Sequence, residues 1–170
     1  RAEPPRPGSG SAPTPRLPET ERNLVGAFLD FPGLHAGDCA RDVQELLTSD
    51  DLRAIFRLTA RFGGARGVDA SALLEDIGDD NPARGWLERR LALQGFEDEA
   101  SARRYVDRAV EELRTRQIER ESKRLSREIL QARRAGDDER ADALMRRRME
   151  LFRSARRESP PRDGAEGTKR

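Results

Sequence analysis

Apolar residues recur at helical spacing along most of this chain. They come three or four residues apart, which is the pattern of helices that bury one face. No segment alternates with the period of two that marks a strand, and β-branched residues are sparse. The pattern predicts an all-α fold that begins with a helical bundle over residues 19–112. The core positions expected in this bundle are Leu24, Phe28, Val43, Leu47, Ile55, Phe56, Leu73, Ile77, Trp86, Leu91, Val106 and Val110.

Residues that favour helix ends divide the predicted bundle into short helices. Thr20, Ser49 and Asp69 are placed to cap three of them, because their side-chain oxygens can accept from the free N–H groups of a first turn. Asn81-Pro82 predicts another start, with the proline at the first helical position. The glycine-rich stretch 63–67 is expected to form a loop between helices.

The apolar pattern narrows after Leu113 to a thin seam in two highly charged stretches. The last element of the bundle begins near Asp98 or Ser101, and no helix breaker lies between Leu113 and Arg134. One continuous helix of about 35 residues, about 50 Å long, is therefore expected to end near Arg134. Gly136 suits the end of that helix and the acidic residues after it suit the start of the next. Two helices joined by so short a link fold back antiparallel, which predicts a hairpin over 113–157. Its seam is formed by Ile118, Leu125, Ile129 and Ala132 and by Ala141, Leu144, Leu151 and Ala155.

The second helix of this hairpin carries an apolar stripe beyond its seam. Met145, Met149 and Phe152 lie roughly 90° around the helix from the seam, at about 100° per residue. A single antiparallel neighbour needs one seam only, so the extra stripe is typical of a contact with another protein. The alternative is that the stripe widens the hairpin's own seam or folds against the bundle. With the arginines beside it, the predicted partner-binding set is Met145, Arg148, Met149, Phe152, Arg153 and Arg156.

Charge is balanced overall but not locally. The 170 residues are 38% charged with a net charge of +1, whereas residues 114–157 contain 15 basic and 8 acidic residues, a net charge of +7. Such a basic hairpin is either an Arg-rich solvated surface or a nucleic-acid surface. Acidic residues interspersed along it favour the first interpretation, so no direct nucleic-acid binding is expected.

Residue types that carry catalysis are scarce. Cys39 is the single cysteine, which excludes an intrachain disulfide and is compatible with a reducing, cytoplasmic location. His35, the single histidine, has no cluster of further ligands or a nucleophile near it in the sequence. The glycines of 63–67 lack the lysine of a phosphate-binding loop. No run approaches the roughly 20 apolar residues of a membrane span. We therefore expect no active site, no metal, no cofactor and no membrane contact.

The two ends are expected to be disordered. Six of the ten prolines fall in residues 1–18, and the stretch 158–170 is polar and contains Pro160 and Pro161. Such segments bury too little apolar surface to offset the entropy of ordering. The chain also begins with Arg1 and not with Met, so we expect it to be a piece of a longer protein.

The order of these features resembles the C-terminal helicase-binding domain of bacterial DNA primase. The resemblance covers about residues 19–157. In that family the leucines of the first helix run into an x-x-P-x-L motif, which Phe31-Pro32-Gly33-Leu34 matches. The family's two charged terminal helices are joined by a G-D turn, which Gly136-Asp137 matches.

The resemblance implies a docking module and no enzyme. In that family the bundle resembles the N-terminal domain of the replicative helicase, and the hairpin carries much of the contact with the N-terminal domains of that hexameric helicase. The docked module stimulates the helicase and holds primase at the replication fork. The parent protein would be DNA primase, whose zinc-binding and polymerase domains are not in this sequence, and the isolated chain is expected to be a monomer. Two alternatives stay open: the N-terminal domain of a replicative helicase, and a basic hairpin that binds nucleic acid directly.

Overall fold

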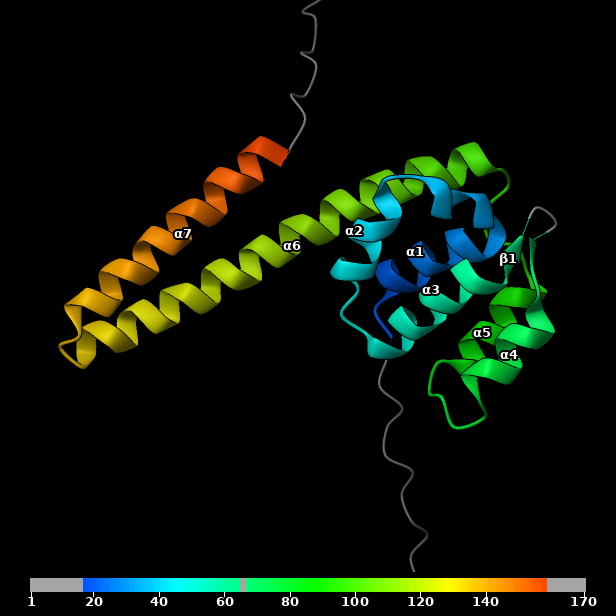
Figure 1. Ribbon diagram of the computed structural model, residues 1–170, viewed down its shortest axis with the longest axis horizontal. Helices are drawn as coiled ribbons and strands as arrows, with labels where there is room; N and C mark the ends of the chain where they lie inside the picture. The colour runs from blue at the N-terminus through cyan, green and yellow to red at the C-terminus, as the bar shows by residue number, and fades with distance from the viewer. Residues whose placement is uncertain (1–16, 65–66, 159–170) are drawn as a thin grey trace, which may run out of the picture. The chain divides into compact units, whose positions relative to one another are not determined.

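A computed structural model describes residues 17–64 and 67–158. The predicted all-α fold is confirmed, since the described residues form seven α-helices, one 3-10 helix and a two-stranded ribbon (Figure 1). In chain order the elements are α1 (Glu19–Asp30), η1 (Pro32–Ala36), α2 (Cys39–Leu46), α3 (Asp50–Phe62), β1 (Gly63–Gly64), β2 (Gly67–Val68), α4 (Ala70–Ile77), α5 (Arg84–Ala92), α6 (Glu99–Arg134) and α7 (Asp138–Glu158).

The described residues form two compact units, unit 1 up to Glu111 and unit 2 from Glu112, with their boundary within α6. Unit 1 contains the short helices and the first part of α6, and unit 2 contains the rest of α6 and α7. The predicted disordered segments 1–18 and 158–170 lie almost entirely outside the described residues, so the structure does not test them.

Two of the predicted helix caps are confirmed. The Ser49 hydroxyl accepts from the Leu52 N–H at 3.3 Å, and the Asp69 carboxylate accepts from the Ala72 N–H at 3.1 Å. The Thr20 cap is wrong, because Thr20 lies inside α1, which begins at Glu19.

The expected start of α5 is also wrong. The carboxamide oxygen of Asn81 accepts from the Ala83 N–H at 2.8 Å. This closes a turn before the helix, which begins only at Arg84.

The predicted glycine loop contains a minimal β-ribbon. Gly63 pairs with Val68 and Gly64 with Gly67 in antiparallel register, so the expectation of no strand is wrong at this point. A strand of two residues is too short to show an alternating pattern in the sequence. Glycine is needed at 63, since a Cβ there would lie 2.5 Å from the Thr59 carbonyl oxygen and 2.7 Å from Pro32.

The core of unit 1 is built on α3, which packs against α1 and α4. Nine of the twelve predicted core residues are buried, and Phe28 and Phe56 meet edge to face with ring centroids 4.9 Å apart. Ile77, Trp86 and Leu91 are only partly buried, so their assignment to the core is wrong. The reason is that α4 and α5 each bury a single side chain and leave the rest of their apolar faces partly open.

A buried carboxylate holds the start of α3. Glu21, 2% exposed, accepts from the backbone N–H of Thr48 at 3.0 Å and from that of Ser49 at 3.1 Å, and also from the Thr48 hydroxyl. A buried carboxylate needs such donors, because they replace the water it loses. This contact leaves no signal in the sequence, since Glu21 and Thr48 are far apart along the chain.

His35 belongs to the aromatic cluster of this core. Its ring lies 4.8 Å from the ring centroids of both Phe28 and Phe56. Nε2 is 2.7 Å from the Thr59 hydroxyl, which itself donates to the Phe56 carbonyl at 2.7 Å. The hydroxyl proton is thus engaged, so Nε2–H is the donor to Thr59. Burial lowers the pKa of His35 from 6.5 to about 4.

This burial predicts an acid-sensitive fold. Unfolding restores a His35 pKa near 6.5, so the stabilising effect of the neutral ring is complete above pH 6.5 and is lost as the pH falls toward 4. Because the side chain keeps some solvent access, we expect a loss of about 1–2 kcal/mol from this group. Urea titrations at pH 7 and pH 4.5 measure it. His35→Gln should unfold with a smaller pH dependence, and an unchanged dependence would contradict the assignment.

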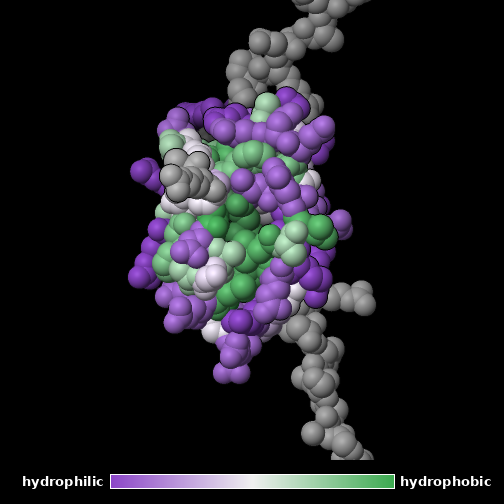
Figure 2. Space-filling model, turned by 90° about the vertical axis from the view of Figure 1, so that its right-hand side faces the viewer, coloured by the Kyte–Doolittle hydropathy of each residue, from purple (hydrophilic) through white to green (hydrophobic). Residues whose placement is uncertain are grey.

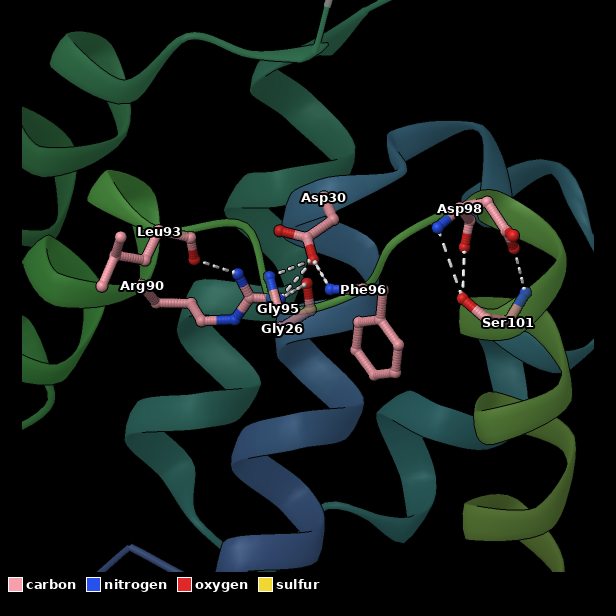
Figure 3. Close-up of polar contacts among 8 residues, drawn as sticks. All are labelled: Gly26, Asp30, Arg90, Leu93, Gly95, Phe96, Asp98 and Ser101. Atoms are coloured by element: carbon pink, nitrogen blue, oxygen red, sulfur yellow. Dashed lines mark hydrogen bonds and ion pairs between the residues drawn. The ribbon is translucent and has the colours of Figure 1, made fainter.

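A second buried contact ties the loop after α5 to α1 (Figure 3). The Asp30 carboxylate forms an ion pair with Arg90 and accepts from the backbone N–H groups of Gly95 and Phe96, both at 3.0 Å. Arg90 also donates to the carbonyls of Gly26 at 3.0 Å and Leu93 at 2.7 Å.

Two glycines make room for this guanidinium. A Cβ on either Gly26 or Gly95 would lie 2.7 Å from an Arg90 nitrogen. The arginine is therefore enclosed by backbone on two sides, and its charge is compensated by Asp30.

Candidate protein-docking surface

The hairpin of unit 2 is set by a glycine turn. Gly136 has φ +73°, a left-handed conformation that glycine adopts without strain. The N–H of Asp137 donates to the Ala132 carbonyl at 3.0 Å and ends α6. The Asp137 carboxylate then accepts from the Arg140 N–H at 3.0 Å and caps α7. The two helices run antiparallel, side by side (Figure 1).

The seam between α6 and α7 is buried mainly on the α6 side. Leu125, Ile129 and Ala132 of α6 are buried. Among the described residues of α7, only Ala141 is buried. The predicted seam residues Ile118, Leu144, Leu151 and Ala155 are partly buried.

A polar layer interrupts this seam near its middle. Arg148 Nε donates to the hydroxyl of Ser122 at 3.1 Å, and Ser122 is 8% exposed. Beside this layer an Arg147 nitrogen lies 3.4 Å from a Glu121 carboxylate oxygen. The hairpin therefore buries little apolar area and carries polar contacts inside its seam.

This thin seam predicts early local opening. Residues 118–155 should exchange amide hydrogens faster than the helices of unit 1, because few buried apolar contacts hold them. Hydrogen exchange of the free chain measures this residue by residue. Protection of the hairpin equal to that of α1 and α3 would contradict it.

Several apolar side chains of the hairpin lie outside its seam. We call this set the hairpin face and define it by Leu130, Met145, Met149 and Phe152. Leu130, Met149 and Phe152 are 50%, 57% and 43% exposed, and with Leu93 of unit 1 they are the exposed large apolar residues among those described. Such exposed groups on a charged protein mark interaction sites.

The contacts place these residues on the same side. Leu130 and Arg133 are neighbours at i,i+3 on α6, and Arg133 reaches the Met145 sulfur at 3.6 Å on α7. Met145 and Met149 are neighbours at i,i+4, and Met149 and Phe152 at i,i+3. The hairpin face therefore runs from α6 across to α7 and then along it.

The structure brings together part of the predicted partner-binding set. Met145, Met149 and Phe152 share the hairpin face, with Met145 partly buried under Arg133. Arg153 and Arg156 are exposed on α7 and can serve as a charged rim. Arg148 is exposed as well, and it also reaches across the seam to Ser122.

Sequence reasoning missed Leu130 and Arg133. The signal was present, because Leu130 is a large apolar residue outside the seam positions of α6. However, Leu130 directly follows the seam residue Ile129, and only the pairing of the helices assigns it to the side of Met145.

The arginines of unit 2 are partly matched by carboxylates. Arg116 pairs with Glu112, and Arg124 lies 2.6 Å from Glu121 and 3.7 Å from Glu128. These i,i+3 and i,i+4 pairs are typical of a solvated helix face. They reduce the charge that α6 could present to phosphates.

The other candidates for chemistry have structural roles. Burial raises the pKa of the Cys39 thiol, with Asp107 acting in the same direction, so Cys39 lacks the character of a nucleophile. Asp50 pairs with Arg53, and Asp79 lies 3.1 Å from Arg84. Within residues 17–64 and 67–158, no group of three or more acidic, His or Cys side chains could hold a metal ion. No helix in that part of the chain is long and apolar enough to cross a membrane.

Unit 1 has a pocket of about 560 Å³ that offers no catalytic arrangement. It is lined by the end of α1, by the glycines of the β-ribbon and by Glu99. Its carboxylate Asp30 is already engaged by Arg90. Figure 2 shows apolar side chains in a hollow on one face of the molecule, bordered by hydrophilic residues.

Comparison of this chain with protein-family models, with curated proteins and with solved structures finds no match.

Proposed function

We propose that this chain is the helicase-binding module of a bacterial DNA primase. In this proposal it docks primase onto the N-terminal domains of the hexameric replicative DNA helicase at the replication fork, in the cytoplasm, and stimulates the helicase. The module itself carries no catalysis, and primer synthesis belongs to the polymerase domain of the parent primase.

The hairpin face is the observation that carries the proposal. Three of its four residues are more than 40% exposed, although a two-helix element is short of apolar contacts of its own. Two flexible methionines beside an aromatic ring suit a groove or helix surface on a partner. Arg153 and Arg156 supply cations at the rim, where they can meet acidic residues and speed association.

Direct binding of nucleic acid is the second candidate, favoured by the net charge of +7 over residues 114–157. The pairing of Arg116 and Arg124 with glutamates speaks against it, because those cations are not free to neutralise phosphates. The two candidates differ in salt dependence. Binding to phosphates loses about 10³–10⁵ in affinity between 50 and 200 mM salt when six to ten contacts are made, whereas an apolar contact loses far less.

Size-exclusion chromatography with light scattering tests the proposal. The chain is mixed with the replicative helicase of the same organism, and separately with single-stranded and double-stranded DNA, at 50 and 200 mM salt. We expect a helicase complex at both salt concentrations and no stable DNA complex. DNA binding without helicase binding would overturn the proposal in favour of the second candidate.

A further inference from the structure

The seam of the hairpin contains an arginine where its pattern calls for an apolar residue. Ala141, Arg148 and Ala155 are spaced seven residues apart on α7, so Arg148 occupies a seam position between two alanines. Ser122 stands seven residues before Ile129 on α6 and occupies the matching position. A polar pair within an apolar seam weakens its packing. The other contacts of Arg148 indicate a second role for this pair.

The arginine has two contacts that point in different directions. Its Nε donates to the hydroxyl of Ser122 at 3.1 Å, which fixes the stem of the side chain across the seam. Its Cζ lies 5.8 Å from the ring centroid of Phe152, one helical turn further along α7. A guanidinium at this distance from an aromatic ring attracts it.

The Phe152 ring could instead fold over the open end of the seam. It lies one turn from the seam residues 148 and 155, at the open end of the seam. Ile118 and Leu151 there are only partly buried, and covering them would remove apolar surface from water. The ring instead remains 43% exposed beside the guanidinium.

We propose that Arg148 is a positioning residue, which is anchored on Ser122 and holds the Phe152 ring on the hairpin face. Arg148 then affects partner binding mainly through the position of the Phe152 ring, whereas Arg153 acts through its own charge at the rim. The consequence for helicase binding rests on the proposed function, whereas the placement of the ring is a property of the free chain.

Ser122 provides the sharpest test, because at 8% exposure it offers a partner almost nothing to touch. Ser122→Ala in the full chain removes the anchor and keeps every charge. The matched control is Ser126→Ala, which removes a hydroxyl that donates to the Ser122 carbonyl at 2.8 Å and leaves the Arg148 contact in place. Ser122→Thr keeps a hydroxyl and serves as the rescue.

The first readout needs no partner. Relaxation of the labelled Phe152 ring by a dissolved gadolinium chelate reports how exposed the ring is in the free chain, with Phe152→Leu used to assign the signal. We expect weaker relaxation in Ser122→Ala and in Arg148→Gln, and wild-type relaxation in Ser126→Ala and Ser122→Thr. Equal relaxation in Ser122→Ala and Ser126→Ala would overturn the proposal.

The second readout is helicase affinity at two salt concentrations. We expect Ser122→Ala to weaken binding by about two- to fivefold with an unchanged salt dependence. The loss should vanish when Phe152→Ala is already present, because the two residues act as one unit. An undiminished loss in that background would overturn the proposal. If the wild-type chain does not bind the helicase, the proposed function fails, and the ring relaxation alone decides the role of Arg148.

Discussion

Phe152→Ala is expected to weaken binding of the chain to its replicative helicase by about 30-fold or more. A buried aromatic anchor loses about 2 kcal/mol or more on truncation, and each 1.4 kcal/mol corresponds to about tenfold in affinity. Phe152 is the one aromatic residue of the hairpin face, so it should carry a large share of the contact. Isothermal titration of the full chain with the helicase measures the change.

Two control variants separate this effect from general damage. Leu93→Ala removes another large apolar side chain, 74% exposed but located in unit 1, and should leave affinity unchanged. Arg153→Ala should have a smaller effect that grows at low salt, since a rim charge chiefly alters the association rate. Normal binding by Phe152→Ala, together with lost binding by Leu93→Ala, would move the contact from the hairpin to unit 1.

Asp30→Ala is expected to destabilise unit 1 by about 3–5 kcal/mol. The side chains of Asp30 and Arg90 are 6% and 13% exposed, so removing the carboxylate leaves a guanidinium buried without its counter-charge. The N–H groups of Gly95 and Phe96 lose their acceptor at the same time. Urea unfolding followed by the fluorescence of Trp86, the single tryptophan, reports the loss in this unit.

The matched control is Asp79→Ala, which breaks an ion pair with Arg84 at 3.1 Å in which the carboxylate is 91% exposed. We expect it to cost less than about 1 kcal/mol. Asp30→Asn keeps an acceptor for the backbone groups and should fall between the two, which keeps the test informative if Asp30→Ala does not fold. Equal losses of stability for Asp30→Ala and Asp79→Ala would contradict this prediction, because the buried pair would then contribute no more to stability than the exposed one.

Local chemistry made much of the fold predictable. The cap residues Ser49 and Asp69 act within three residues of themselves, and Gly136 acts within its own turn, so the sequence neighbourhood contains the whole interaction. The 36-residue helix α6 follows from an uninterrupted run of helix-forming residues. The apolar period further placed Met145, Met149 and Phe152 outside the strict seam.

Contacts between distant residues were not predictable in this way. Asp30 and Arg90 are separated by 60 positions, and His35 and Thr59 by 24, and neither pair leaves a periodic signal. The apolar period places Ser122 and Arg148 at inner positions of the hairpin, but only the pairing of α6 with α7 shows that they contact each other. Likewise, only the contact between Arg133 and Met145 places Leu130 on the hairpin face.

The two methionines give the most direct test of helicase docking through the hairpin face. Met145 and Met149 are the only methionines in the chain and both belong to that face, so a chain labelled with ¹³C-methyl methionine gives one signal from each. Unlabelled helicase is added in steps while the methyl spectrum is recorded. The account predicts that both signals shift or broaden in proportion to complex formation. Unchanged methyl signals in the presence of a formed complex, or the absence of any complex at saturating helicase, would contradict it.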